Sequence, residues 1–202
     1  MNYDQFFETD FILENERVRL EPLKEKHFEL LLPVAMNKPL WEFTTAKINT
    51  EADFKKYFET ALEEKRLKKS YPFAYFDKQQ NQYAGCTRFG NIEFNHKKLE
   101  IGWTWIHPAL QGTGFNKHCK FLLLSFAFET LLLNRVELKT SSLNLKSQKA
   151  MLKIGAVKEG VLRRNIINDD GSLRDSVYFS FINEEWPEIK QRIFGEFIVL
   201  HQ

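Results

Sequence analysis

The sequence predicts an α/β (α+β) domain with a mixed, mostly antiparallel seven-stranded sheet flanked by helices. Residues 72–106 contain three strand-like segments joined by short polar turns, which indicates an antiparallel meander. The pattern then changes to strand, helix, strand, which requires a parallel pairing through a right-handed crossover. A chain of 202 residues, 43% of them hydrophobic, suits a single domain spanning residues 1–202.

The chain before the meander alternates between one short strand and two helices. The strand is expected at 17–20, where a proline soon follows, and the segment 24–32 has the apolar spacing of a helix. We expect Thr50 to cap the second helix, because Asp53 stands three residues later, where a capping box places an acceptor side chain. That helix is expected to run on to about residue 67.

The meander itself is marked by aromatic and β-branched residues, which favour strands. Its strands are expected at 72–77, 83–94 and 99–106, with polar turns at 78–81 and 95–98. Gly90 allows a kink in the second strand, and Pro108 ends the third.

The second half of the chain adds three helices and three strands. The helices are expected at 116–132, 147–154 and 184–194, and the strands at 135–140, 156–163 and 173–182. The last two strands form a hairpin, because the segment 168–171 between them, Asn-Asp-Asp-Gly, has the composition of a tight turn. Gly155 ends the second of these helices. This order of elements places helices on both faces of the sheet.

Composition argues against several classes of protein. A formal net charge of +2 is too small to indicate nucleic acid as the main partner. The most apolar stretch, 121–133, is short and interrupted by Ser125 and Glu129, so no membrane span is expected. The two cysteines lack CxxC spacing and the histidines lack metal-ligand spacing, so we expect no disulfide framework and no metal. An acidic N-terminus unlike a signal peptide adds to the expectation of a cytoplasmic protein.

A turn with two glycines connects the third meander strand to the following helix. Gln111-Gly112-Thr113-Gly114 leads into the helix, so unpaired amides and the positive end of the helix dipole lie at the turn. Glycines permit positive φ and close backbone approach, which suits a phosphate. The turn is not a P-loop, and it lacks the third glycine of a dinucleotide fingerprint, where Lys117 stands. Taken alone, the turn is as compatible with a plain connection between elements as with a phosphate site, and a nucleotide site for ATP is a third alternative.

The segments around this turn resemble the GNAT acetyltransferases, in the family's order. The turn resembles the Arg/Gln-x-x-Gly-x-Gly/Ala motif. The other matching segments are Glu100-Ile101-Gly102-Trp103, Ile106-His107-Pro108, Phe126-Ala127-Phe128-Glu129, Asn134-Arg135-Val136-Glu137-Leu138, Asn144 with Ser147, Leu152 with Ile154-Gly155-Ala156, Glu159-Gly160-Val161-Leu162-Arg163, Arg174-Asp175-Ser176-Val177-Tyr178-Phe179-Ser180 and Glu185-Trp186-Pro187. The resemblance covers roughly Arg17 to Pro187. It is close to the branch that includes the ribosomal-protein N-terminal acetyltransferases (RimJ/RimL-like).

This resemblance implies acetyl-CoA as co-substrate, with no metal. In the family the fourth and fifth strands, here 99–106 and 135–140, are parallel and splay apart, and the pantetheine arm lies between them. The backbone contacts to pantetheine are then expected from Trp105, Ile106 and His107, and those to pyrophosphate from Gln111, Gly112, Thr113, Gly114, Phe115 and Asn116. Gln111 stands where arginine is commoner, and Asn116-Lys117-His118 replaces smaller or acidic residues, so the phosphate contacts depart from the usual pattern.

The same resemblance assigns catalytic roles to two side chains. Glu100 is expected to be the general base, directly or through a water, and the alternative is a strand carboxylate paired with a cation. Ser147 is expected to contact both the cofactor and the departing thiol, and the alternative is a helix N-cap. Asn144 would position the cofactor, or else satisfy backbone groups of its loop. A backbone N–H near Ile106 is the expected oxyanion donor.

The resulting functional prediction is an acetyl-CoA-dependent N-acetyltransferase that transfers acetyl directly to a primary amine. A protein N-terminus is the favoured acceptor, by resemblance. The alternatives are a small-molecule amine such as a polyamine, amino sugar or antibiotic, and a non-catalytic acyl-CoA-binding domain. The acceptor is expected between 36–69 and 164–174, and the chain is expected to be a monomer or a homodimer.

Overall fold

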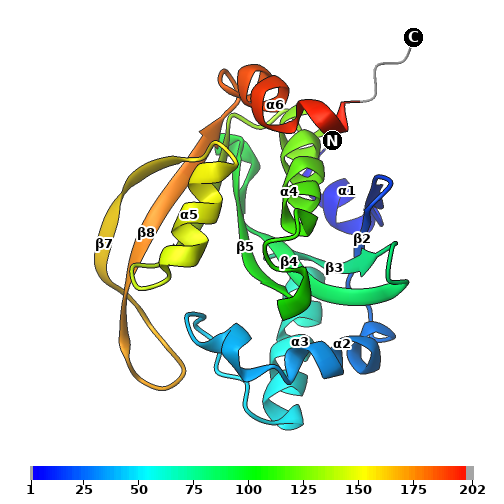
Figure 1. The fold of residues 1–202 in the computed structure, drawn as a ribbon, viewed down its shortest axis with the longest axis vertical. Helices are drawn as coiled ribbons and strands as arrows, with labels where there is room; N and C mark the ends of the chain where they lie inside the picture. The colour runs from blue at the N-terminus through cyan, green and yellow to red at the C-terminus, as the bar shows by residue number, and fades with distance from the viewer. Residues whose placement is uncertain (1, 199–202) are drawn as a thin grey trace.

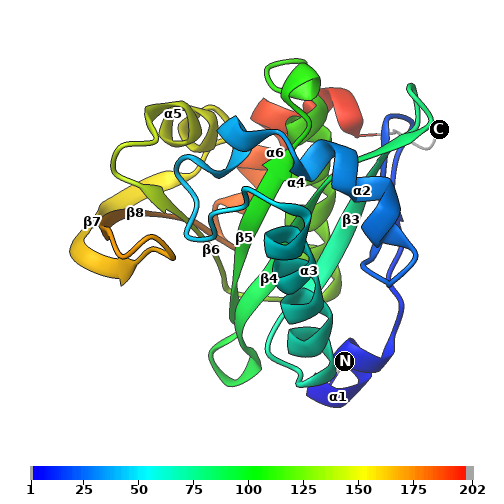
Figure 2. The same ribbon diagram turned by 90° about the horizontal axis from the view of Figure 1, so that it is seen from below.

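The computed structural model describes residues 2–198, which form one sheet with helices on both faces (Figure 1, Figure 2). The strands are β1 Leu13–Glu14, β2 Val18–Pro22, β3 Tyr71–Asp77, β4 Gln82–Glu93, β5 Lys98–Ile106, β6 Arg135–Ser141, β7 Val157–Ile167 and β8 Leu173–Ile182. The α-helices are α1 Tyr3–Glu8, α2 His27–Ala35, α3 Glu51–Arg66, α4 Phe115–Ser125, α5 Leu145–Lys153 and α6 Trp186–Phe194. Short 3₁₀ turns connect several of them, and a π-helical segment, Phe126–Thr130, continues α4.

The sheet has eight strands in the order β1-β2-β3-β4-β5-β6-β8-β7. Every neighbouring pair is antiparallel except β5 and β6, which confirms the mixed, mostly antiparallel sheet and its crossover. The predicted count of seven strands was wrong, because the two-residue β1 pairs with β2 at the sheet edge. Two residues are too few to show the alternation by which a strand is recognised in a sequence.

Two apolar layers hold the helices against opposite faces of the sheet. Phe73 and Tyr75 of β3 belong to the layer under α1, α4 and α6, whereas Ala74 between them belongs to the layer under α2 and α3. This alternation follows from the two-residue period of a strand. Each face of the sheet therefore has its own core.

Most predicted elements are present, and their differences from the prediction have local causes. Thr50 caps α3 through a capping box with Asp53, as predicted. The helix predicted at 116–132 is α-helical only to Ser125, and the Leu131 amide then bonds to the Phe126 carbonyl five residues earlier, which is π-helical geometry. The short α1 was not predicted. It buries two phenylalanines and carries its own capping box at Asn2.

The parallel pairing of β5 with β6 is short, and the two strands separate beyond it. It joins only Lys98, Leu99 and Glu100 of β5 to Arg135, Val136 and Glu137 of β6. Farther along β5, Trp103 has a positive φ of 51° and the register with β4 shifts. A Cβ atom at Gly90 would overlap the Trp103 indole, so glycine there makes room for the irregularity. Strand β5 thus has a free edge toward β6 from Ile101 onward.

Candidate functional site

The glycine turn lies at the N-terminus of α4 and is open to solvent. Gly112 and Gly114 have φ values of 82° and 90°, a region that glycine adopts without strain. Gly114 is the N-cap of α4, and at either glycine no heavy atom from beyond the adjacent chain lies within 4 Å of the position a Cβ would take. Among the described residues, neither glycine amide donates a backbone hydrogen bond. These amides are therefore donors for an anion at the positive end of the helix.

Asn116, in the first turn of α4, adds a second sign of a ligand-binding position. Its side-chain carbonyl oxygen is buried and has no hydrogen-bond partner among the described residues. Phe115 is different, because its side chain is fully buried against Tyr75 and only its backbone can serve a ligand. An unpaired buried acceptor beside free amides fits a ligand with phosphate acceptors and amide or hydroxyl donors. The residues at this turn therefore fit acetyl-CoA.

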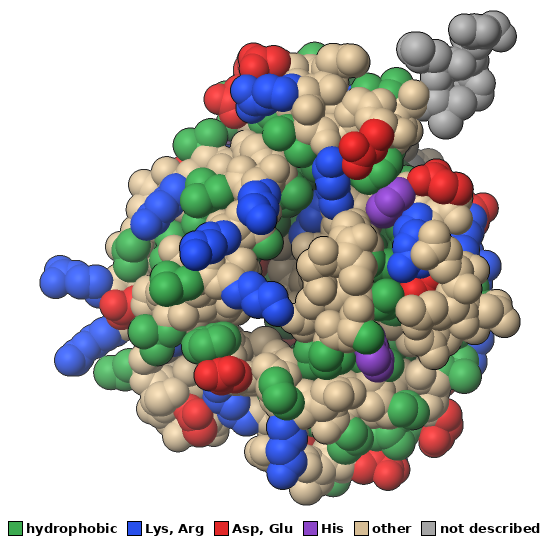
Figure 3. Space-filling view, viewed as in Figure 1, with side chains coloured by type: hydrophobic (Ala, Val, Ile, Leu, Met, Phe, Trp, Pro, Cys, Tyr) green, Lys and Arg blue, Asp and Glu red, His purple; other side chains and the backbone are tan. Residues whose placement is uncertain are grey.

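Gln111 bridges the two sides of the opening between β5 and α5. Its amide nitrogen donates to the Ile106 carbonyl at 3.1 Å, and its amide oxygen accepts from Lys146 at 2.6 Å. Figure 3 shows a hollow in this part of the molecule, with Lys and Arg side chains around it. Both ends of the Gln111 side chain are thus bonded to the protein, which leaves its backbone as the part that can serve a phosphate.

Residues Asn144 and Ser147 define the start of α5 on the other side of this opening. The Asn144 side-chain oxygen accepts from the Ser147 amide at 3.0 Å, which makes Asn144 the N-cap. The alternative in which Ser147 caps this helix was therefore wrong. The Ser147 hydroxyl has no hydrogen-bond partner among the described residues, so its proton is available to a ligand.

Trp105, Ile106 and His107, the residues predicted to pair with pantetheine, differ in which polar groups lack a hydrogen-bond partner. The Ile106 carbonyl accepts from the Gln111 side chain, as noted above. The His107 amide donates to the Ala84 carbonyl at 2.7 Å, and the His107 carbonyl accepts from the Leu110 amide at 2.9 Å. Its backbone is thus bonded within the protein, unlike that of a free edge. The Trp105 indole is buried 5.5 Å from the Trp41 ring, and its N–H has no partner among the described residues.

Glu100 lies at the last paired position of β5, where the two strands begin to separate. It is 3% exposed, and its Oε2 accepts from Asn91 Nδ2 at 2.7 Å and lies 2.9 Å from Lys139 Nζ. Oε1 has no hydrogen-bond partner among the described residues. The structure therefore contains the predicted carboxylate–cation pair, and it leaves the second carboxylate oxygen for another contact.

Comparison with known proteins agrees with this geometry. A sequence profile described as the acetyltransferase (GNAT) domain matches residues 17–157. The chain belongs to the GNAT acetyltransferase family. The "Putative ribosomal N-acetyltransferase YdaF" of Bacillus subtilis is 33% identical over 103 residues, which are 51% of this chain and 55% of YdaF. The chain matches somewhat more than half of the length of each of these curated relatives.

Solved structures show the same fold over most of the GNAT chain. A GCN5-related N-acetyltransferase from Brucella melitensis has a TM-score of 0.85 and 25% identity, over 93% of this chain and 86% of that one. The ribosomal-protein-S5-alanine acetyltransferase of Vibrio fischeri has a TM-score of 0.71 and 21% identity, over 88% of this chain and 99% of that one. The second likeness concerns the fold alone.

Several polar residues beside Glu100 were not predicted from the sequence. Lys139 on β6 lies directly opposite Tyr178 on β8, and its ammonium is 5.9 Å from the centre of the Tyr178 ring. Arg174 lies on the same face of β8 as Tyr178, because side chains two residues apart share a face. The only sequence signal was the alternation of Arg174 and Tyr178 with the apolar Val177 and Phe179, which does not reveal the neighbours on other strands.

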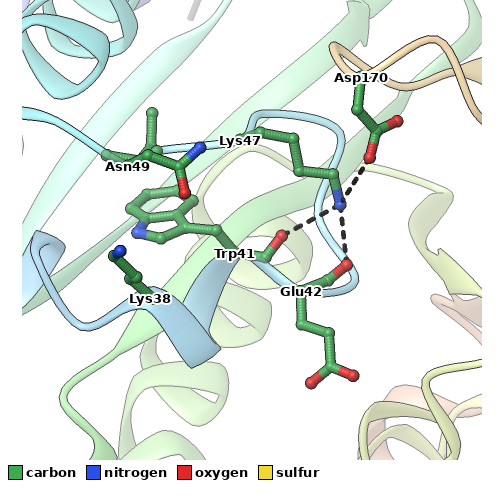
Figure 4. Close-up of a pocket in the computed structure, with 7 residues that line it drawn as sticks. Lys38, Trp41, Glu42, Lys47, Asn49 and Asp170 are labelled. Atoms are coloured by element: carbon green, nitrogen blue, oxygen red, sulfur yellow. Dashed lines mark hydrogen bonds and ion pairs between the residues drawn. The ribbon is translucent and has the colours of Figure 1, made fainter.

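A loop between α2 and α3 meets the tip of the β7–β8 hairpin above this face. The Asp169 amide donates to the Thr45 carbonyl at 3.1 Å, and Lys47 Nζ lies 3.8 Å from an Asp170 carboxylate oxygen. Lys47 also donates to the carbonyls of Trp41 and Glu42, as Figure 4 shows. A cavity of about 270 Å³ lies at this junction, lined by Lys38, Trp41, Glu42, Lys47, Ile48, Asn49 and Asp170. None of the residues predicted to bind acetyl-CoA lines it.

Other possible reactive groups do not form a site. Cys86 and Cys119 are both buried, and burial raises the pKa of each thiol above its usual range, so neither is a reactive thiolate. Within residues 2–198, no group of three or more His, Cys, Asp or Glu side chains could hold a metal. No helix in this range is long and apolar enough to cross a bilayer.

Proposed function

We propose that this chain is an acetyl-CoA-dependent N-acetyltransferase that transfers acetyl directly to a primary amine, with a protein N-terminus as the favoured acceptor. The observation that carries the proposal is the alignment of two features along one strand. The open glycine turn follows the end of β5 where β5 has a free edge, and Glu100 lies where that edge begins. The name of YdaF supports a ribosomal-protein acceptor.

The first part of the proposal concerns cofactor binding. The amides of Gly112 and Gly114, with the first turn of α4, would hold the pyrophosphate, and the orphaned Asn116 oxygen would accept a hydrogen bond from the cofactor. Acetyl-CoA supplies an acetyl group on a thioester. The edge of β5 that does not pair with β6, around Trp105 and Ile106, would orient the pantetheine arm by strand addition, and the pantetheine would replace Gln111 Nε2 at the Ile106 carbonyl.

The second part concerns proton transfer. An ammonium acceptor must lose a proton before its nitrogen can attack, and Glu100 is the buried carboxylate at the point where the strands separate. Asn91 and Lys139 hold Oε2, which fixes the carboxylate and leaves Oε1 to take the proton, directly or through a water. Ser147 holds a proton on an unbonded hydroxyl at the start of α5 and would donate it toward the departing sulfur.

A coenzyme A release assay over a matched panel of amines tests this proposal. The panel contains peptides with different N-terminal residues, a polyamine and an amino sugar, and mass spectrometry identifies the acetylated product. We expect turnover with peptides and addition of one acetyl group at the N-terminus. Turnover with a small amine and with none of the peptides would show that the acceptor is a small molecule and not a protein N-terminus. Binding of acetyl-CoA without turnover on any amine would support the non-catalytic alternative.

A thermal-shift comparison of acetyl-CoA with ATP tests the cofactor independently of turnover. Acetyl-CoA should stabilise the protein, because a ligand that binds only the folded state raises the midpoint of unfolding. Stabilisation by ATP without any by acetyl-CoA would refute the assignment of the glycine turn to acetyl-CoA.

A further inference from the structure

Arg174 is a charged side chain that neither the cofactor site nor the proposed proton transfer uses. It lies near the start of β8 and shares a face with Ser176 and Tyr178, while Val177 and Phe179 point into the opposite core. Tyr178 lies opposite Lys139 on β6, and Lys139 forms the ion pair with Glu100. Arg174 and Glu100 are thus on one face of the sheet, the face that carries α2 and α3.

The guanidinium of Arg174 is only partly satisfied by the protein. Its Nη1 lies 3.4 Å from the Phe43 carbonyl and 3.3 Å from the Thr45 hydroxyl, both at the long end for a hydrogen bond. Its Nε is buried without a partner, and no carboxylate forms an ion pair with it among the described residues. A guanidinium has five N–H donors, and a buried donor that lacks a partner costs stability. This arrangement is therefore incomplete without another acceptor.

Electrostatics agree with this position. Burial lowers the pKa of Arg174 below its ordinary value, while the charge of Glu100 and the nearby Tyr178 hydroxyl raise it. This agrees with the placement of Arg174, Tyr178 and Glu100 on one face of the sheet. An acceptor whose amine approaches Glu100 from the side of the 43–45 loop would pass Arg174.

The chemistry of this guanidinium selects among possible acceptors. A planar fork of N–H groups binds a carbonyl or carboxylate oxygen, and a partly desolvated cation repels a second cation. A polyamine, which carries several positive charges, is thus a poor fit. In a peptide N-terminus the first carbonyl is on the carbon that bears the amine, so one oxygen acceptor always lies next to the reacting nitrogen.

We propose that Arg174 recognises the carbonyl oxygen adjacent to the acceptor amine, and so makes the enzyme specific for α-aminoacyl groups such as a peptide N-terminus. This rests on the proposed N-acetyltransferase function. The alternative role for Arg174, a tie between β8 and the 43–45 loop, does not explain the use of a charged side chain on neutral partners at long distances.

The test compares wild type with Arg174→Met and Arg174→Lys on two acceptors, a short peptide with N-terminal alanine and an alkylamine of similar size without the carbonyl. Taking the ratio of variant to wild type for each acceptor cancels the different basicity of the two amines. Loss of a charged hydrogen bond predicts that Arg174→Met lowers kcat/KM for the peptide by roughly 10- to 100-fold, mostly through KM, and changes the alkylamine ratio much less. Calorimetric titration of the peptide in the presence of coenzyme A should show the same loss of affinity. Arg174→Lys should recover little, because lysine lacks the fork.

Lys47→Met is the matched control, because it loosens the same loop–hairpin junction without changing Arg174. It should affect both acceptors equally. Equal losses on both acceptors in Arg174→Met would show that Arg174 is only a structural tie and would overturn this inference while leaving the acetyltransferase intact. A wild-type protein that acetylates neither acceptor would instead overturn the proposed function and the inference with it.

Discussion

Lys120 on α4 provides a quantitative test of the core described above. It is 4% exposed, and its ammonium has one hydrogen bond, to the Thr104 hydroxyl at 3.2 Å, with no carboxylate partner among the described residues. Burial lowers the pKa of Lys120 from 10.5 to about 8. We predict that Lys120→Met, which keeps the length of the side chain and removes its charge, stabilises the protein at neutral pH.

The size of the effect follows from the shift in pKa. A fall from 10.5 to about 8, at roughly 1.36 kcal/mol per unit, means that burying the charged amine costs about 3 kcal/mol. Below pH 8 the amine is charged in both states, so the whole cost applies. Between pH 8 and 10.5 the unfolded state binds more protons than the folded state, so the stability of the wild type rises with pH. Lys120→Met should therefore gain about 2–3 kcal/mol at pH 7 and little at pH 10.5.

Urea unfolding at pH 7 and near pH 10 measures this difference. The control is Lys55→Met, because the Lys55 side chain is 64% exposed and should give no gain at either pH. A loss of stability in Lys120→Met at pH 7, or the same gain at both pH values, would refute the argument. Either result would mean that the protein stabilises the Lys120 charge by a contact that the structure does not contain.

Four further substitutions test the site itself. Gly114→Val should weaken acetyl-CoA binding by more than about 10-fold in calorimetric titration, because a side chain would occupy the cradle and positive φ is strained for valine. Glu100→Gln should lower kcat by about 100-fold or more and leave acetyl-CoA affinity unchanged. Asn144→Ala should cost about 1 kcal/mol of stability through loss of the α5 cap, whereas Ser147→Ala should lower kcat without that cost.

Each of these has an outcome that contradicts it. Gly171→Val, at another exposed glycine of positive φ, is the control for Gly114→Val, and equal losses of affinity in the two would point to general misfolding. Full activity of Glu100→Gln at neutral pH would remove Glu100 as the base. Destabilisation by Ser147→Ala equal to that by Asn144→Ala would contradict the capping assignment.

The glycine turn could be read from the sequence because its information is local. Gly112 and Gly114 are two residues apart, and a turn with positive φ at the start of a helix is a property of that short segment. The partners of Glu100 could not be read in this way. Lys139 reaches Glu100 only through the parallel pairing of β5 with β6, and the register of that pairing depends on where the crossover ends.

Arg174 shows the same limit over a longer distance. Its hydrogen-bond partners are about 130 residues away in the chain, on a loop that has no regular periodicity. The N-cap of α5 was only partly readable from the sequence, because Asn144 and Ser147 are both residue types that cap helices. The choice between them depends on where α5 begins, and helix boundaries are read from a sequence only to within a residue or two.

The most direct test of the central claim is an NMR titration of the isotope-labelled protein with acetyl-CoA, observed at the glycine amides. The account predicts that the Gly112 and Gly114 resonances move most, because these amides would donate to the pyrophosphate, while Gly171 at the hairpin tip does not move. Saturable binding of acetyl-CoA that leaves Gly112 and Gly114 unmoved would contradict it.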